Sequence, residues 1–181
     1  MRCLILNGNP KPSGFDDYLG RFTQAIAQQG HAAERIDLRD LNLRYCVGCW
    51  ACWWKSPGVC ALKDDMAALY PKLVNADLVL WASPLIVGSV SALLKKVQDR
   101  FIPTIHPYIE LVDGECHHRH RYPHNADLGV IVEPTAEDTD ADLAITLDLF
   151  QRFSRNTRTR FRLFVTTATP VAEVAHEALA A

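Results

Sequence analysis

The segment Cys3-Leu4-Ile5-Leu6-Asn7-Gly8-Asn9-Pro10 decides the fold that the sequence predicts. Its first four residues form a continuous apolar run, which indicates a buried strand, and its last four favour a turn. Residues 78–82 and 128–132 form two further apolar runs of the same kind. Strands that are apolar throughout are typical of parallel sheets covered by helices on both faces. The sequence therefore predicts an α/β protein.

Two more polar segments complete the predicted sheet. Residues 33–38 contain Glu34 and Arg35, and residues 160–166 contain arginines, so we expect both strands at the edges. Apolar residues at helical spacing predict helices that begin near Asp16, at Asp64 or Asp65, near Gly88, after Glu137 and near Val171. Pro71 is expected to kink or shorten its helix, and residues 102–126 to be irregular. The result is a three-layer sandwich with a five-stranded parallel sheet in the order 2-1-3-4-5.

The bulk composition limits the classes of protein to which the chain can belong. Its 181 residues fit one domain, 1–181, and a net charge of −2 argues against a nucleic-acid binder. The longest hydrophobic stretch, around residues 78–86, is far shorter than the roughly 20 residues that cross a bilayer. Six cysteines without a signal peptide favour reduced thiols. We therefore expect a cytoplasmic, single-domain protein that binds neither nucleic acid nor membrane.

Four of the six cysteines lie close together with the spacing C-x2-C-x2-C-x7-C, at Cys46, Cys49, Cys52 and Cys60. Thiolates at such spacing can bind one iron–sulfur cluster, but ferredoxin motifs have a shorter last gap, and zinc sites usually have two separated pairs. The alternative is a tightly folded loop in which thiols and indoles fill space. Three tryptophans lie between these cysteines, so we favour packing over a metal site and leave the metal open.

The predicted strand order also predicts where a ligand binds. In such sheets the site lies at the carboxyl ends of the strands, where the winding reverses between strands one and three. This places the site at residues 8–17, at residues 83–88 and at the turn after Val132. A glycine-containing turn that opens a helix suits a phosphate, and Lys11 and Ser13 add a charge and a hydroxyl. The alternative is an ordinary connection in which Asp16, as the N-cap, itself occupies the anion position.

In combination, three motifs resemble the NADPH-dependent FMN reductase and iron–sulfur flavoprotein branch of the flavodoxin-like superfamily. They are Gly8-Asn9-Pro10-Lys11, then Cys46-x-Gly48-Cys49-x-x-Cys52…Cys60…Asp64-Asp65-Met66, and finally Ala76-Asp77…Ser83-Pro84…Lys95…Asp99-Arg100. The resemblance covers roughly the first hundred residues. It implies a flavodoxin-like fold and an FMN-binding, NAD(P)H-dependent oxidoreductase that passes electrons to a second acceptor. The alternatives are an electron carrier of the iron–sulfur flavoprotein type and a flavin-free thiol sensor or binding protein.

The resemblance also implies a role for particular residues. The FMN phosphate would be held by Asn9, Lys11, Ser13 and the backbone of Gly14, Phe15 and Asp16. The isoalloxazine ring would be lined by Pro84, Leu85, Ile86, Val87 and Gly88. A 4Fe–4S cluster, if present, would take Cys46, Cys49, Cys52 and Cys60. The family has an Asn-Thr pair where this chain has Phe15-Asp16, and a carboxylate there repels a phosphate dianion unless it turns away.

The remaining aromatic and histidine residues suggest contacts between subunits. Relatives build the flavin site near a subunit contact, and Trp50, Trp53 and Trp54 are many indoles for one surface loop, so we expect a homodimer or tetramer. Residues 116–121 contain three histidines, of which His118 and His120 could share a side. A solvated or interface loop is the favoured interpretation there, and a basic pocket for an NADPH phosphate or an acidic substrate is the alternative.

Overall fold

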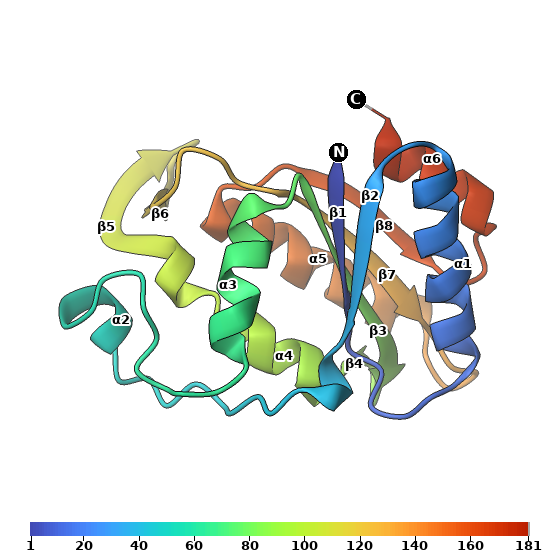
Figure 1. Ribbon diagram of the computed structural model, residues 1–181, viewed down its shortest axis with the longest axis horizontal. Coiled ribbons are helices and arrows are strands. Elements are labelled where there is room, and N and C mark those ends of the chain that lie inside the picture. The colour runs from blue at the N-terminus through green and yellow to red at the C-terminus, as the bar shows by residue number, and fades with distance from the viewer. Residues whose placement is uncertain (181) are drawn as a thin grey trace.

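Five parallel strands form the central sheet of the computed structural model, which describes residues 1–180 (Figure 1). Their order is β2-β1-β3-β7-β8, and the short β4 (Ser89–Val90) pairs antiparallel with the end of β3. The five strands are β1 (Arg2–Asn7), β2 (Ala32–Asp37), β3 (Leu78–Ile86), β7 (Asp127–Glu133) and β8 (Phe161–Thr166). The predicted parallel order 2-1-3-4-5 is confirmed, with the charged strands at the edges.

Helices cover both faces of this sheet, which gives three layers (Figure 1). Side chains alternate along β1, so Leu4 and Leu6 face one layer while Cys3 and Ile5 face the other. The first layer contains α3 (Met66–Asn75), α4 (Ala92–Asp99) and α5 (Asp140–Thr157), and the second contains α1 (Gly14–Gln28) and α6 (Val171–Leu179). Burial raises the pKa of the Cys3 thiol to about 12, so this cysteine packs as an apolar residue.

Three helix boundaries differ from the prediction. Helix α1 begins at Gly14 rather than Asp16, because Ser13 is the N-cap. Helix α4 begins at Ala92 rather than Gly88, because Ser91 caps it and the preceding residues form a turn and β4. Helix α3 continues to Asn75, so Pro71 does not end it. No helix within residues 1–180 is both long and apolar enough to cross a membrane.

Residues 102–126 are not irregular, and that prediction is wrong. They contain a 3₁₀ turn and an antiparallel hairpin of β5 (Ile105–Val112) and β6 (Glu115–His120) outside the main sheet (Figure 1). The hairpin escapes detection because histidines and arginines interrupt the apolar alternation of β6. The indole of Trp53, in the short helix α2 (Ala51–Trp54), donates to the carbonyls of Ile102 and Ile105, both at 3.1 Å. The cysteine loop therefore packs against the hairpin.

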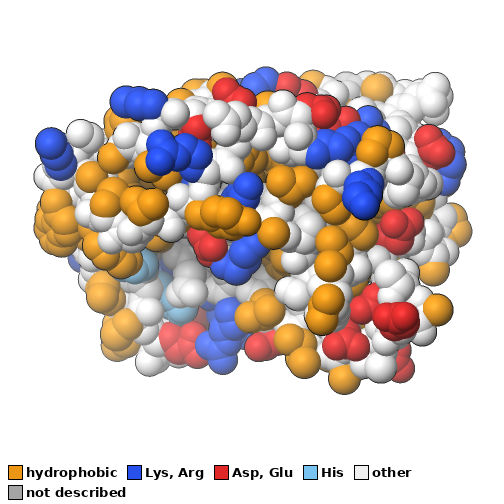
Figure 2. All heavy atoms as spheres, turned by 90° about the horizontal axis from the view of Figure 1, so that it is seen from below, with side chains coloured by type: hydrophobic (Ala, Val, Ile, Leu, Met, Phe, Trp, Pro, Cys, Tyr) orange, Lys and Arg blue, Asp and Glu red, His pale blue; other side chains and the backbone are white. Residues whose placement is uncertain are grey.

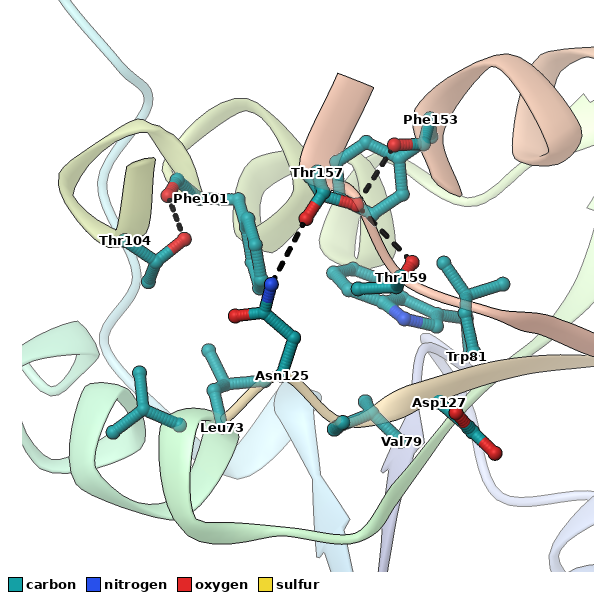
Figure 3. A pocket seen from close by; sticks show the side chains of 13 residues that line it. Leu73, Val79, Trp81, Phe101, Thr104, Asn125, Asp127, Phe153, Thr157 and Thr159 are labelled. Carbon is teal, nitrogen blue, oxygen red and sulfur yellow. Dashed lines mark hydrogen bonds between the residues drawn. The ribbon is translucent and has the colours of Figure 1, made fainter. Parts of the chain in front are cut away.

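Trp81 anchors the core at the amino-terminal half of β3. Its indole is 1% exposed and meets the ring of Phe153 edge-on, with centroids 5.2 Å apart. Beside these rings lies a largely apolar cavity of about 20 Å³, across which the Asn125 amide reaches the Thr157 carbonyl at 3.5 Å (Figure 3). This space is far smaller than the several hundred Å³ typical of cofactor sites, so it belongs to the core.

Candidate functional site

The turn after β1 and the end of β3 lie side by side, as the strand order predicts. Gly8 N donates to the carbonyl of Ala82 at 2.7 Å, and the Ser91 hydroxyl donates to the carbonyl of Gly8. A Cβ on Gly8 would lie 2.8 Å from Leu94 Cβ, so only glycine allows this close approach. We call residues 8–16, residues 83–88 and Glu133 together the rim.

Asp16 is turned into the rim, where it forms a network that joins several strand ends. Its Oδ1 accepts from Asn7 Nδ2 and Arg39 Nη1, both at 2.8 Å. Its Oδ2 accepts from Asn9 Nδ2 at 2.8 Å and from Ser13 N at 2.9 Å. Burial opposes ionisation of this carboxyl, but the four hydrogen bonds outweigh burial and lower its pKa. Asp16 is therefore an ionised capping-box residue whose charge is compensated by Arg39.

The carboxylate of Asp16 accepts hydrogen bonds from several donors of the first turn, which are then not free to bind a ligand. Ser13 N bonds Asp16, Phe15 N bonds the Ser13 hydroxyl at 3.2 Å, and Asp16 N bonds the Ser13 carbonyl. Within residues 1–180, the N–H of Gly14 and the ammonium group of Lys11 have no hydrogen-bond partner. The Ser13 hydroxyl, which accepts from Asn9 Nδ2, can still donate its proton. Lys11, Ser13 and Gly14 therefore fit a phosphate at a helix N-terminus.

Residues 84–88 contribute unequally to the rim. Leu85 is buried in the core, whereas the Ile86 side chain is 45% exposed and that of Val87 is 99% exposed. Glu133, at the end of β7, lies on the same edge of the sheet. Burial, and then the charge of Asp16, raise the pKa of its carboxyl. The apolar side chains of Ile86 and Val87 are thus available to a ligand, while Leu85 supports the strand.

The four cysteines of the loop line one small cavity of about 30 Å³, together with Trp50, Tyr70 and Arg100. Burial, and then the charge of Cys60, raise the pKa of the Cys52 thiol. Among residues 1–180, no three His, Cys, Asp or Glu side chains are close enough to hold a single metal ion. We call this space the cysteine cavity.

A buried ion pair holds the cysteine cavity in place. The guanidinium of Arg100 pairs with the carboxylate of Asp64, and their side chains are 1% and 0% exposed. Arg100 Nη2 also donates to Cys60 Sγ at 3.4 Å, and Arg100 Nη1 donates to the Arg44 carbonyl at 3.2 Å. Burial opposes ionisation of Asp64, but hydrogen bonds from Arg100 and from Arg44 N lower its pKa. The loop is thus tied at both ends to a single charged pair.

The cysteine cavity and the rim are separate. No residue that lines the cavity belongs to residues 8–17 or 83–88. The cavity lies beside Arg100 at the end of α4, whereas Ser91, at the start of α4, contacts the rim. The eight residues of α4 separate Ser91 from Arg100, which corresponds to about 12 Å along the helix axis.

The histidines and tryptophans outside these two sites have structural contacts. The His118 ring lies against Trp53, with centroids 4.9 Å apart, and His117 bonds Asn156 at 3.1 Å. These histidines do not form a metal site with each other among residues 1–180. Trp53 packs within the chain, while Trp54 is 72% exposed. Figure 2 shows hydrophobic side chains gathered at the end of the molecule that carries this loop.

Sequence reasoning missed Asn7, Arg39 and Glu133 at the rim, and the role of Arg100 at the cysteine cavity. Asn7 and Glu133 are the last residues of β1 and β7, each directly after an apolar run, and a polar residue at that place is the signal that could have identified them. Arg39 follows β2 in a 3₁₀ turn and carries no comparable signal. Arg100 and Cys60 are 40 residues apart, so only the fold brings them together.

Comparisons with known proteins agree with this geometry. The sequence model of the NADPH-dependent FMN reductases matches residues 1–114. An iron–sulfur flavoprotein of Methanocaldococcus jannaschii is 38% identical over 104 residues, which are 57% of this chain and 53% of that protein. One from Archaeoglobus fulgidus is 32% identical over 100 residues, 55% of this chain and 48% of that protein. The chain thus spans about half the length of the curated relatives that it matches.

Solved structures show the same fold at low sequence identity. An FMN-dependent NADH-azoreductase from Bacillus anthracis matches with a TM-score of 0.64 at 15% identity. The match covers 98% of this chain and 94% of the azoreductase chain. An NAD(P)H:quinone oxidoreductase from Methanothermobacter marburgensis has a TM-score of 0.62 at 18% identity, over 97% of this chain and 93% of its own. The fold is therefore flavodoxin-like. The match over residues 1–114 shows that this chain belongs to the NADPH-dependent FMN reductase family.

Proposed function

We propose that this chain binds FMN non-covalently at the rim and acts as an NAD(P)H-dependent oxidoreductase that passes electrons to a second acceptor. The observation that carries the proposal is the family match together with the close packing of Gly8 against the end of β3. When bound, FMN supplies the hydride and electron chemistry, and the protein supplies position and electrostatics. No catalytic acid or base is assigned. The cytoplasm is our proposed location, on the grounds of cysteine usage.

The residues of the rim have distinct proposed roles. Lys11, the Ser13 hydroxyl and the Gly14 N–H would bind the phosphate, because they are the donors that the first turn leaves free. Arg39 compensates the charge of Asp16, so the carboxylate repels a phosphate less than an unpaired one would. Ile86 and Val87 would present apolar side chains to the ring and exclude water from that side.

Parallel titrations with FMN and riboflavin test this proposal. The wild-type protein is expected to bind FMN and to oxidise NADH or NADPH when FMN and an acceptor are present. Lys11→Gln is expected to weaken FMN binding and to leave riboflavin binding unchanged, because only FMN carries the phosphate. The control is Lys55→Gln, an exposed lysine in the cysteine loop. Absence of FMN binding by the wild type would contradict the flavin assignment itself.

An electron carrier is the second candidate function. Cys46, Cys49, Cys52 and Cys60 line one cavity, and several relatives are named iron–sulfur flavoproteins. We nevertheless expect reduced thiols and no intact 4Fe–4S cluster in aerobically prepared protein, because indoles pack among the thiols. Iron and acid-labile sulfide assays after anaerobic reconstitution decide between the two. Stoichiometric iron that is lost in Cys49→Ser would favour the carrier, and absence of both flavin and iron would favour a thiol sensor.

A homodimer or tetramer is the proposed assembly. Trp54 is exposed on the cysteine loop, and four other residues in or next to that loop in the sequence are exposed too: Tyr45, Val47, Trp50 and Val59. Contiguous exposed aromatic and aliphatic side chains are typical of protein interfaces.

A further inference from the structure

Another cavity of this protein is lined mainly by polar and charged residues. It has a volume of about 520 Å³ and lies between the tip of the β5–β6 hairpin and the segment that joins α5 to β8. This volume falls within the range typical of sites for small molecules. The charged and titratable residues of its lining are Asp113, Glu115, His117, Arg155, Arg158 and Arg160. We call it the arginine cavity.

The arginine cavity and the rim lie at opposite edges of the main sheet. Arg160 comes directly before β8, so the cavity lies where this strand begins, whereas the rim lies where the strands end. The six residues of β8 span about 20 Å. In Figure 1 the β5–β6 hairpin likewise lies toward the edge at which β1 begins. The three arginines also lie outside residues 1–114, which the family model matches.

Two carboxylates beside the cavity are already compensated by arginines. Arg158 Nη1 lies 3.2 Å from an oxygen of Glu110, and Arg152 Nη1 donates to both oxygens of Glu115, at 3.0 and 3.2 Å. The hydrogen bond and the charge of Arg152 lower the pKa of Glu115, so this carboxyl is ionised and paired at neutral pH. Neither carboxylate therefore leaves a net negative charge at the cavity.

Arg155 and Arg160 carry charges that no acid compensates. Both line the cavity, and both are exposed. Within the described residues 1–180, neither side chain forms an ion pair or a hydrogen bond. Asp113, at the hairpin tip, is the one acid of the lining that has no cation partner in that range. Two unpaired guanidinium groups and one unpaired carboxylate give the cavity an excess of positive charge.

The end of α5 does not by itself explain these arginines. A helix C-terminus favours cations in its last turn, which accounts for Arg155. Arg160 comes three residues after Thr157, the last residue of the helix. Arg158 has a φ of 54°, a left-handed conformation that glycine or asparagine usually takes at the end of a helix. Arginine is strained there, and strained residues cluster at ligand-binding sites.

We propose that Arg155, Arg158 and Arg160 bind the phosphate group of a small organic phosphate in the arginine cavity. A planar guanidinium offers a fork of N–H donors that matches two phosphate oxygens at once. Phosphate fits this lining better than carboxylate does, because its tetrahedral oxygens can accept from donors in several directions, whereas a carboxylate has two oxygens in one plane. This site is independent of flavin binding at the rim.

Calorimetric titration with glycerol 3-phosphate at pH 8 and low ionic strength tests the proposal. The phosphate then carries about two negative charges, and exposed charges are weakly screened. Arg155→Gln and Arg160→Gln are each expected to weaken binding about tenfold, because each removes a charged donor. Asp113→Asn should tighten binding about two- to fivefold, because it removes the unpaired carboxylate, and asparagine tolerates the φ of 51° at this position.

The matched control is Arg21→Gln, which removes an exposed arginine from α1, on the other face of the sheet from α5. It should leave binding unchanged, as should Lys11→Gln at the rim. A loss in Lys11→Gln without a loss in Arg155→Gln and Arg160→Gln would place the phosphate at the rim and overturn the inference. The inference would also be overturned by an equal loss in Arg21→Gln, by absence of binding to the wild type, or by equal affinity for malonate, a dicarboxylate of the same charge.

Discussion

Replacement of Asp64 by asparagine tests whether the buried ion pair with Arg100 organises the cysteine cavity. Asparagine has nearly the same shape, so the variant removes the negative charge without leaving a hole. The Arg100 guanidinium, 1% exposed, would then face a neutral amide in place of the carboxylate, beside its other acceptors, the Arg44 carbonyl at 3.2 Å and Cys60 Sγ at 3.4 Å. Its Nε already lacks a partner within residues 1–180. A buried cation would thus lose its counter-charge.

The expected cost follows from this geometry. Removal of one partner of a buried ion pair typically costs about 3–5 kcal/mol in the free energy of unfolding. For a chain of this size, that corresponds to a decrease in Tm of roughly 6–20 °C. The matched control is Asp65→Asn at the neighbouring residue, which is exposed and accepts one bond from Asn42 N at 2.8 Å. This control is expected to cost about 1 kcal/mol or less.

Urea unfolding of both variants, followed by circular dichroism, measures the difference. The lowered pKa of Asp64 means that the pair contributes stability above the unfolded-state pKa of about 3.9, and that this contribution is lost as the pH falls through the folded-state pKa. The gap between wild type and Asp64→Asn should therefore shrink below about pH 4. Equal losses for Asp64→Asn and Asp65→Asn at pH 7 would refute the assigned role of the pair.

Three further predictions concern the rim and the exposed indoles. Asp16→Thr is expected to tighten FMN binding up to about tenfold by titration, because it removes a negative charge beside the phosphate, and unchanged or weaker binding would contradict this. Glu133→Gln should stabilise the protein at pH 7 but not below about pH 4 in urea titrations. The raised folded-state pKa of Glu133 means that its ionisation lowers stability as the pH rises, and glutamine does not ionise. An equal effect at both pH values would contradict this. The wild type should sediment as a dimer or tetramer at micromolar concentration and Trp54→Ser as smaller species, whereas a wild-type monomer would refute the assembly.

The main sheet was predictable because its signals are local. Runs such as residues 78–82 are apolar throughout, and charged residues mark the edge strands, so order follows from sequence alone. The β5–β6 hairpin was not predictable, because histidines and arginines interrupt the alternation of β6 and because the indole of Trp53, from a distant loop, binds the Ile105 carbonyl. At the rim, the location followed from the strand order. The orientation of Asp16 did not, because Asn7 and Arg39 approach it from two other segments.

Helix α4 has a mechanical consequence for the two sites at its ends. At its start Ser91 is fixed to Gly8, and after its last turn Arg100 is fixed to Cys60. One inserted residue would turn the two ends by about 100° relative to each other and lengthen the helix by about 1.5 Å. The Ser91–Gly8 and Arg100–Cys60 hydrogen bonds could not both form after such a change. Helix α4 therefore acts as a spacer of fixed length and phase between the rim and the cysteine cavity.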